Sequence, residues 1–202
     1  MTALPPYAAA DGPFCNDPAG SGASAAVRFS RGAFFGMDKT LIPDIYVDRY
    51  SDISPQMLLD MGIKGLLADV DETLVPHGLR TPTPELVAWL GALRAAGIRV
   101  CILSNNSQHR IRPFADSVGL PFMCRCFKPN LSAAKKALAV LRLQPSEVAV
   151  IGDQIFTDLR MAVRLGAKSI LTDPLGEEYT AFVRLKRLKE KKYKRLYRKT
   201  AL

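Results

Sequence analysis

Gly65-Leu66-Leu67-Ala68 and the segment that follows it, Asp69-Val70-Asp71-Glu72-Thr73-Leu74, decide the fold. A short apolar run that ends in polar residues predicts a buried strand of a parallel sheet. Asp69 and Asp71 would then lie at the carboxyl end of this strand, where open α/β sheets build their ligand sites. Two carboxylates there can share a divalent cation and still differ in role, one as a nucleophile and one as a proton donor.

Three further polar segments follow in an order that extends this pattern. Residues 98–103 form a second apolar run, which ends in Ser104-Asn105-Asn106. Lys128-Pro129 comes next, and a third apolar run, residues 148–151, leads into Gly152-Asp153-Gln154-Ile155-Phe156-Thr157-Asp158. Carboxylates gathered at strand ends repel one another unless a cation lies between them. The pattern therefore favours a site that binds a cation.

The alternation of strands and helices predicts an α/β fold, a three-layer doubly wound parallel sheet. A helix is expected to begin within Thr81-Pro82-Thr83-Pro84-Glu85, where a Thr cap precedes a Pro, and to end at Gly97. Further helices are expected over residues 107–118, 132–143 and 156–165, and a further strand over residues 168–171.

The order and spacing of the four motifs resemble those of the haloacid dehalogenase (HAD) superfamily of aspartate-nucleophile phosphatases. Between Leu41 and Tyr179 the chain is similar to the YqeG-type members of subclass IIIA, which are related to the mitochondrial phosphatidylglycerophosphate phosphatases. The matching segments are Pro43-Asp44-Ile45-Tyr46-Val47, Gly62-Ile63-Lys64-Gly65, Leu74-Val75-Pro76, Gly152-Asp153-Gln154 and Thr157-Asp158. The resemblance implies conversion of phosphatidylglycerophosphate to phosphatidylglycerol. Glu72 departs from the pattern, since the group more often carries Asn there, and we expect little consequence.

The resemblance also implies a role for each residue of the first motif. Asp69 would be the nucleophile and would form an aspartyl-phosphate. Asp71 would donate a proton to the leaving alcohol and later take one from the attacking water. Thr73 would steady the loop and the Asp71 carboxylate through its hydroxyl.

The later motifs would bind the phosphoryl group. Ser104 would hydrogen-bond a phosphoryl oxygen, together with the backbone N–H of Asn105 at a helix start. Lys128 would neutralise charge on the phosphoryl group and on Asp69. Plainer roles remain open: Ser104 and Asn105 also suit a strand-to-helix cap, and Lys128 also suits an ordinary loop.

The implied cofactor is Mg²⁺, which prefers oxygen ligands and keeps several of its waters. Asp69, Asp153 and the main-chain carbonyl of Asp71 would hold it. Asp158 would orient metal-bound waters or Lys128, and its alternative role is that of an acid near a helix N-terminus.

HAD enzymes that act on small metabolites often insert a cap domain. Here 30 positions separate Leu74 from Ser104 and 24 separate Ser104 from Lys128, so we expect a capless, open site.

The charge of the chain is concentrated in residues 181–202. The net charge is +9, from 28 Lys and Arg against 19 Asp and Glu, and these last residues hold ten of the basic residues and one acid, Glu190. A helix there would gather apolar residues on one side (Phe182, Leu185, Tyr193, Leu196, Tyr197) and basic residues on the other (Arg187, Lys191, Lys194, Arg195, Arg198). Such a helix suits an anionic membrane surface. The alternatives are a helix packed on the sheet with its charges in water, and a nucleic-acid contact.

The remaining chain divides by composition. Residues 1–26 contain eight Ala, four Pro, three Gly and two Ser, so we expect disorder. Residues 27–62 are expected to form a strap, residues 63–180 the phosphatase domain, and residues 181–202 the basic helix. For residues 27–47 a second membrane-facing patch is the alternative. With no signal sequence, no long apolar run and only four cysteines, we expect a cytoplasmic protein in a reducing compartment, with peripheral contact at the inner membrane face.

Two other functions fit the same sequence. One is a HAD phosphatase that acts on a soluble nucleotide, a phosphopeptide or a nucleic-acid phosphate. The other is a binding protein that uses a HAD scaffold, with RNA or a ribosomal particle as its partner. The leading hypothesis remains hydrolysis of a phosphomonoester on a lipid headgroup; the oligomeric state does not follow from the sequence.

Overall fold

The computed structural model describes residues 14–15, 40–176, 181–195, 197 and 199–200, and the side chains of helix α6 from Arg187 onward. The predicted disorder of residues 1–26 and the first part of the predicted strap therefore lie almost wholly outside the described residues. So do the side chains of Phe182, Leu185, Leu196 and Arg198. Residues 40–62 contribute a strand and a helix to the domain.

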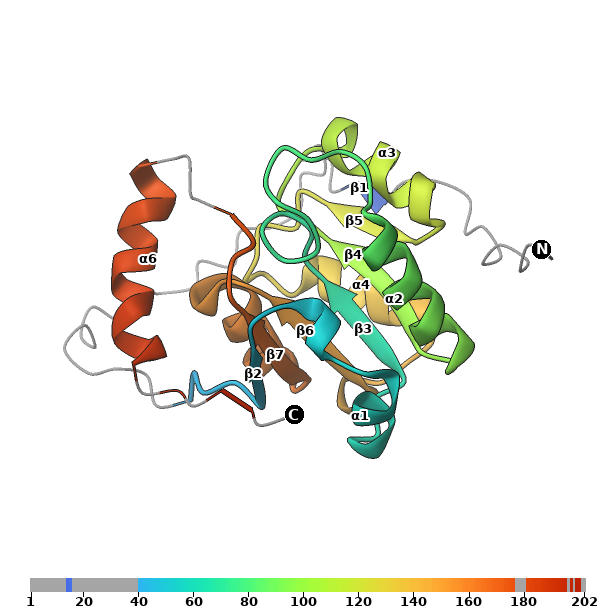
Figure 1. Ribbon diagram of the computed structural model, residues 1–202, viewed down its shortest axis with the longest axis horizontal. Helices are drawn as coiled ribbons and strands as arrows, with labels where there is room; N and C mark the ends of the chain where they lie inside the picture. The colour runs from blue at the N-terminus through green and yellow to red at the C-terminus, as the bar shows by residue number, and fades with distance from the viewer. Residues whose placement is uncertain (1–13, 16–39, 177–180, 196, 198, 201–202) are drawn as a thin grey trace, which may run out of the picture.

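The described strands form one parallel sheet, in the order β1-β5-β4-β3-β6-β7-β2 (Figure 1). Their bounds are β1 Phe14–Cys15, β2 Ile45–Val47, β3 Gly65–Ala68, β4 Arg99–Leu103, β5 Phe122–Cys124, β6 Val148–Gly152 and β7 Lys168–Thr172. Strand β3 lies at the centre and pairs with β4 on one side and β6 on the other. The predicted doubly wound parallel sheet is confirmed.

The helices follow the strands as the sequence predicts, with shifts at their ends. They are α1 Pro55–Asp60, α2 Pro84–Ala95, α3 Gln108–Val118, α4 Ser132–Leu141, α5 Arg160–Leu165 and α6 Ala181–Lys194, with short 3₁₀ turns at Tyr50–Asp52 and Pro145–Glu147. The Thr83 side chain caps α2 by accepting from the N–H of Leu86. Helix α4 ends two residues before the expected Leu143, because Arg142 adopts a left-handed conformation. The helix expected from Phe156 begins instead as a π-turn, η3 Ile155–Leu159.

Apolar side chains cover both faces of the sheet. In β3, Leu66 and Ala68 belong to the cluster that packs under α1, α2 and α3. Leu67 points to the other face and joins the cluster under α4 and α5. A strand buried on both faces needs apolar residues at every position, which explains the uninterrupted run before Asp69.

The C-terminal segment returns to the edge strand β2. Thr200 accepts from the backbone N–H of Tyr46 through its hydroxyl (3.1 Å) and donates its own N–H to the Tyr46 carbonyl (2.8 Å). Tyr193 and Tyr197 are partly buried against an apolar cluster that includes Tyr46. The segment therefore covers an otherwise open sheet edge.

The cysteines differ in state. Cys101 and Cys126 are buried free thiols, whereas Cys124 is disulfide-bonded. This bond departs from the expectation that the cysteines of the chain are reduced. Among the described residues, no helix has both the length and the apolar character needed to cross a membrane.

Candidate active site

The candidate site lies where the central strands end. Asp69 follows β3, Ser104 follows β4, and Asp153 follows β6. Because these three strands are adjacent and parallel, their carboxyl ends meet at one edge. The chain order reverses between β3 and β6, which is the position where open α/β sheets bind ligands.

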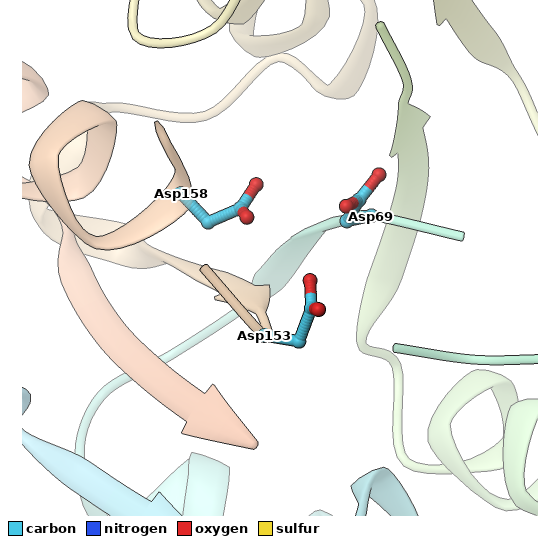
Figure 2. Close-up of side chains that lie close together, drawn as sticks. All are labelled: Asp69, Asp153 and Asp158. Carbon is cyan, nitrogen blue, oxygen red and sulfur yellow. The ribbon is translucent and has the colours of Figure 1, made fainter. Parts of the chain in front are cut away.

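Three carboxylates converge at this edge (Figure 2). One oxygen each from Asp69, Asp153 and Asp158 lies within 4.8 Å of the others, and all three residues are buried. Gly152 permits this approach, since a Cβ at that position would come within 2.3 Å of Asp158 Cγ. A set of three carboxylate oxygens suits a hard divalent cation such as Mg²⁺, so the residues present fit the ion that the sequence pattern implies.

Lys128 lies among the same carboxylates. Its Nζ is 2.8 Å from Asp69 Oδ1 and 2.7 Å from Asp158 Oδ1, and it donates to the Leu103 carbonyl at 3.0 Å. Burial disfavours the ammonium, but the charges of Asp158 and Asp69 outweigh that effect and raise the pKa of Lys128. The lysine is therefore a fixed positive charge beside Asp69.

Burial disfavours the ionised forms of Asp69 and Asp153. Burial raises the pKa of Asp69 to about 7; the charges of Asp158 and Asp153 add to the rise, and Lys128 opposes it. Burial likewise raises the pKa of Asp153 to about 6, with Arg187 opposing it. A divalent cation would favour the ionised forms of both groups.

Asp71 faces a different set of partners. Its carboxylate accepts from Asn106 Nδ2 at 2.7 Å and pairs with the Arg110 guanidinium, and His77 Nδ1 lies 3.9 Å away. The Asp71 carboxylate is thus outside the group formed by Asp69, Asp153 and Asp158. The sequence did not reveal the contacts of Asn106 and Arg110 with Asp71, because these depend on how the loop after β4 and helix α3 pack.

We expected the Thr73 hydroxyl to steady the Asp71 carboxylate, and this expectation was wrong. The hydroxyl instead donates to Asp153 Oδ1 at 3.3 Å. Thr73 is fully buried, so its hydroxyl links the first motif directly to the last.

Ser104 and Asn105 lie beside Lys128. Ser104 is buried, and its Oγ accepts from the N–H of Asn106 at 3.1 Å. The Asn105 side chain accepts from the N–H of Lys128 at 2.8 Å. The expectation that Asn105 stands at a helix start was wrong, because α3 begins at Gln108 with Ser107 as its N-cap.

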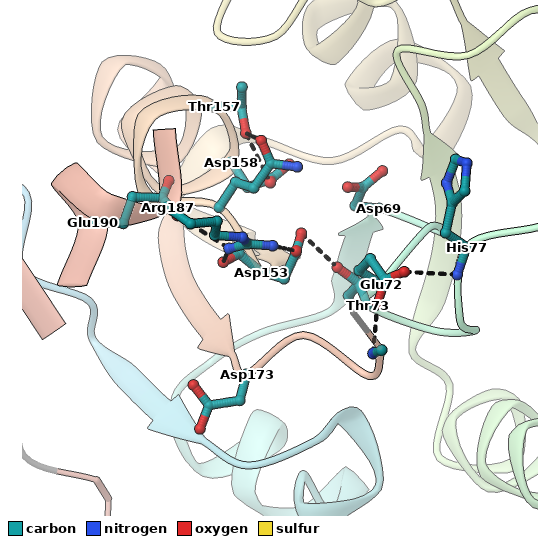
Figure 3. A network of polar contacts seen from close by, with 12 residues as sticks. Asp69, Glu72, Thr73, His77, Asp153, Thr157, Asp158, Asp173, Arg187 and Glu190 are labelled. Carbon is teal, nitrogen blue, oxygen red and sulfur yellow. Dashed lines mark hydrogen bonds and ion pairs between the residues drawn. The ribbon is translucent and has the colours of Figure 1, made fainter. Parts of the chain in front are cut away.

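Glu72 joins two loops at the edge of the site (Figure 3). It has a positive φ of 65° and is buried. Its carboxylate accepts from the N–H of His77 at 2.8 Å and from the N–H of Gly176 at 2.6 Å. The loop after the first motif and the loop before α6 are therefore held together by one side chain.

The helical wheel placed Arg187 on the exposed basic side of the tail, and that placement was wrong. Arg187 pairs with Asp153 Oδ2, donates to the Asp153 carbonyl at 2.7 Å, and lies 3.0 Å from Glu190 Oε2. The sequence carried one signal of this arrangement. Glu190 is the only acid among ten basic residues and stands three positions after Arg187, a spacing that pairs charges on a helix.

Comparisons with known proteins agree with this geometry. A family model described as haloacid dehalogenase-like hydrolase matches residues 55–166. The Bacillus subtilis (strain 168) protein named "Probable phosphatase YqeG" is 32% identical over 156 residues, which cover 77% of this chain and 91% of that protein.

Two solved structures show a weaker likeness to this chain. The 3-deoxy-D-manno-octulosonate 8-phosphate phosphatase from Moraxella catarrhalis is 18% identical, with a TM-score of 0.43 over 59% of this chain and 81% of that one. The cobalt-bound form of the deoxy-D-mannose-octulosonate 8-phosphate phosphatase from Haemophilus influenzae is 17% identical, with a TM-score of 0.45 over 63% of this chain and 87% of that one. The family model and the B. subtilis relative are sufficient by themselves: the chain belongs to the haloacid dehalogenase-like hydrolase family and is a phosphatase.

Proposed function

We propose that the chain is a Mg²⁺-dependent phosphomonoester hydrolase with Asp69 as its nucleophile and phosphatidylglycerophosphate as its substrate. The observation that carries the proposal is the position of the Asp69 carboxylate. It lies at the end of the central strand, 2.8 Å from the Lys128 ammonium and within reach of the Asp153 and Asp158 carboxylates. A carboxylate so placed is suited to attack a phosphoryl group whose charge its neighbours neutralise.

The proposed reaction has two steps. In the first, an Asp69 oxygen bonds to phosphorus, the bond to the leaving alcohol breaks, and Asp71 gives that alcohol a proton. In the second, Asp71 takes a proton from water, the water oxygen bonds to phosphorus, and the P–O bond of the aspartyl-phosphate breaks to release inorganic phosphate and regenerate the Asp69 carboxylate. Asn106 and Arg110 hold the Asp71 carboxylate in one orientation.

In this proposal, Lys128 and its neighbours bind the phosphoryl group. We assign the Ser104 hydroxyl and the Asn105 backbone to the phosphoryl oxygens, and Lys128 to charge neutralisation. Asp69, Asp153 and the Asp71 carbonyl would hold Mg²⁺, with Asp158 as a further ligand or as the partner of Lys128. When bound, the ion supplies positive charge that offsets the charge developing on the phosphoryl oxygens.

Two features support a substrate in a lipid surface. Residues 40–176 are all described and contain no inserted cap domain, so a large headgroup can approach the site. Helix α6 also presents an exposed stripe of Leu188, Lys191, Lys192 and Arg195, spaced so that the four share one face. Basic residues near an anionic surface each contribute about 1 kcal/mol. We therefore propose a cytoplasmic enzyme that contacts the inner membrane face peripherally.

Phosphate release from phosphatidylglycerophosphate in mixed micelles tests the proposal. We expect turnover that requires Mg²⁺ and is abolished by Asp69→Asn, with p-nitrophenyl phosphate as the soluble comparison. Efficient turnover of soluble phosphomonoesters with none of the lipid would refute the lipid assignment and leave the phosphatase assignment intact. In that case nucleotides and nucleic-acid 3′- or 5′-phosphates are the next substrates to assay, because the exposed stripe also attracts polyphosphate chains.

A further inference from the structure

Helix α6 reaches the catalytic edge of the sheet through one side chain, Arg187. The helix lies outside residues 55–166, the part of the chain that matches the family model. Its Arg187 nevertheless contacts Asp153 at two points, the carboxylate Oδ2 and the main-chain carbonyl (Figure 3). Asp153 is fully buried, so these contacts are shielded from water.

The Asp153 carboxylate is held from both sides. Thr73 donates to Oδ1, and Arg187 pairs with Oδ2. Each carboxylate oxygen has two lone pairs, so one hydrogen bond to each oxygen still leaves acceptors for a cation. The arrangement fixes the direction in which the remaining lone pairs point.

Glu190 fixes the helix that carries Arg187. It is buried, and its Oε1 accepts from the N–H groups of Ile155 (2.9 Å) and Phe156 (3.4 Å) at the start of the π-turn. Its Oε2 lies 3.0 Å from Arg187. One turn of α6 therefore holds the loop from Asp153 to Phe156 at its carboxylate, its carbonyl and two amides.

Arg187 could either support a bound cation or take its place, and the charges of this cluster favour support. Arg187 and Glu190 neutralise each other. The remaining set, Asp69, Asp153 and Asp158 with Lys128, sums to three negative charges and one positive, a net of −2. A divalent cation balances that set while Arg187 keeps its place.

We propose that Arg187 is a positioning residue for the metal ligand Asp153, and that Glu190 holds it there. Helix α6 is thereby part of the catalytic centre as well as a surface element. The inference rests on the proposed metal site and is independent of the lipid substrate. Hydrogen bonds to metal ligands typically govern affinity by about 10–100-fold.

Mn²⁺ binding to the full chain, followed by electron paramagnetic resonance without substrate, tests the inference. Mn²⁺ accepts the same oxygen ligands as Mg²⁺. We expect Arg187→Ala to weaken binding by about tenfold or more, and Arg187→Lys to recover part of the loss because it keeps the charge but not both contacts. Lys189→Ala, on the exposed side of the same turn, is the matched control and should bind Mn²⁺ as the parent does.

A second variant and a second readout guard against misfolding. Glu190→Gln keeps an acceptor for the two amides but loses the charge beside Arg187, so a smaller loss of Mn²⁺ affinity is expected. In turnover assays with any accepted phosphomonoester, Arg187→Lys should need more Mg²⁺ for half-maximal rate and approach the parent kcat at saturating Mg²⁺. Unchanged or tighter Mn²⁺ binding in folded Arg187→Ala, checked by circular dichroism, would overturn the inference.

Discussion

Replacement of Lys128 with Met tests the electrostatic account of the site most directly. The change keeps a long side chain but removes the charge that lies 2.8 Å from Asp69 and 2.7 Å from Asp158. Two carboxylate oxygens that lie within 4.8 Å of each other repel by at least roughly 3.5 kcal/mol at an effective dielectric constant of about 20. Loss of one partner from a buried ion pair costs about 3–5 kcal/mol. We therefore expect Lys128→Met to lower the free energy of unfolding by about 3–5 kcal/mol at pH 8 in EDTA.

The size of this loss should depend on pH. The pKa of Asp69 is about 7 in the folded protein against a reference value of 3.8, so between these values the folded state holds a proton that the unfolded chain has released. Stability contributed by this group therefore falls as pH rises through that window. Lys128 opposes the rise in the Asp69 pKa, so its removal extends the window upward. The loss should be smaller at pH 5, where Asp69 is already protonated.

Urea unfolding at pH 5 and pH 8, with EDTA, provides the measurement. The control is Lys168→Met, which removes a surface ion pair of similar length to Asp44 (2.8 Å) that is worth about 0–1 kcal/mol. If Lys128→Met costs no more than Lys168→Met at pH 8, the account of Lys128 as the counter-charge of the acidic cluster is refuted.

Three further predictions concern the same edge of the sheet. Mg²⁺ should stabilise the protein more at pH 8 than at pH 5, because protons on Asp69 (pKa about 7) and Asp153 (pKa about 6) compete with the ion. At a Mg²⁺ concentration of a hundred times its Kd, the free energy of unfolding at pH 8 should rise by about 2.7 kcal/mol. Equal shifts in melting temperature at both pH values would contradict this. Gly152→Ala should destabilise the fold and abolish Mn²⁺ binding, because its Cβ would lie 2.3 Å from Asp158 Cγ; Gly91→Ala, in α2 with open space around the new Cβ, should instead gain about 0.4–1 kcal/mol in thermal unfolding. Glu72→Asn should speed amide hydrogen exchange at His77 and Gly176, since the shorter side chain cannot reach both N–H groups; unchanged protection at both amides would show that the bridge is not needed.

The sequence predicted the parts of the site that follow directly from strand ends. Asp69, Ser104 and Asp153 each come after an apolar run, and parallel strands bring such positions together. Lys128 lies in a loop, and its place between Asp69 and Asp158 was anticipated only through the family resemblance. The three layers of the fold could be predicted from the alternation of apolar runs and helix signals alone.

The contacts that the sequence did not predict all depend on how separate elements pack. The Thr73 hydroxyl turns to Asp153 because the first and last motifs lie on adjacent strands. Arg110 reaches Asp71 from the first turn of α3, and Arg187 reaches Asp153 from α6. A helical wheel ranks the sides of a helix by polarity alone, so it predicted that Arg187 faces water. Arg187 instead pairs with a buried acid elsewhere in the chain, Asp153.

The separation of Arg187 from Asp153 along the chain sets an order of events during synthesis. The two partners are 34 positions apart in the chain, so a nascent chain that has completed the central strands has not yet supplied the guanidinium. Domains generally fold as units as the chain emerges, beginning from the N-terminus. On the proposal for Arg187, a sheet that forms first lacks this support at its acidic edge, and full affinity for the cation is expected only after helix α6 has packed.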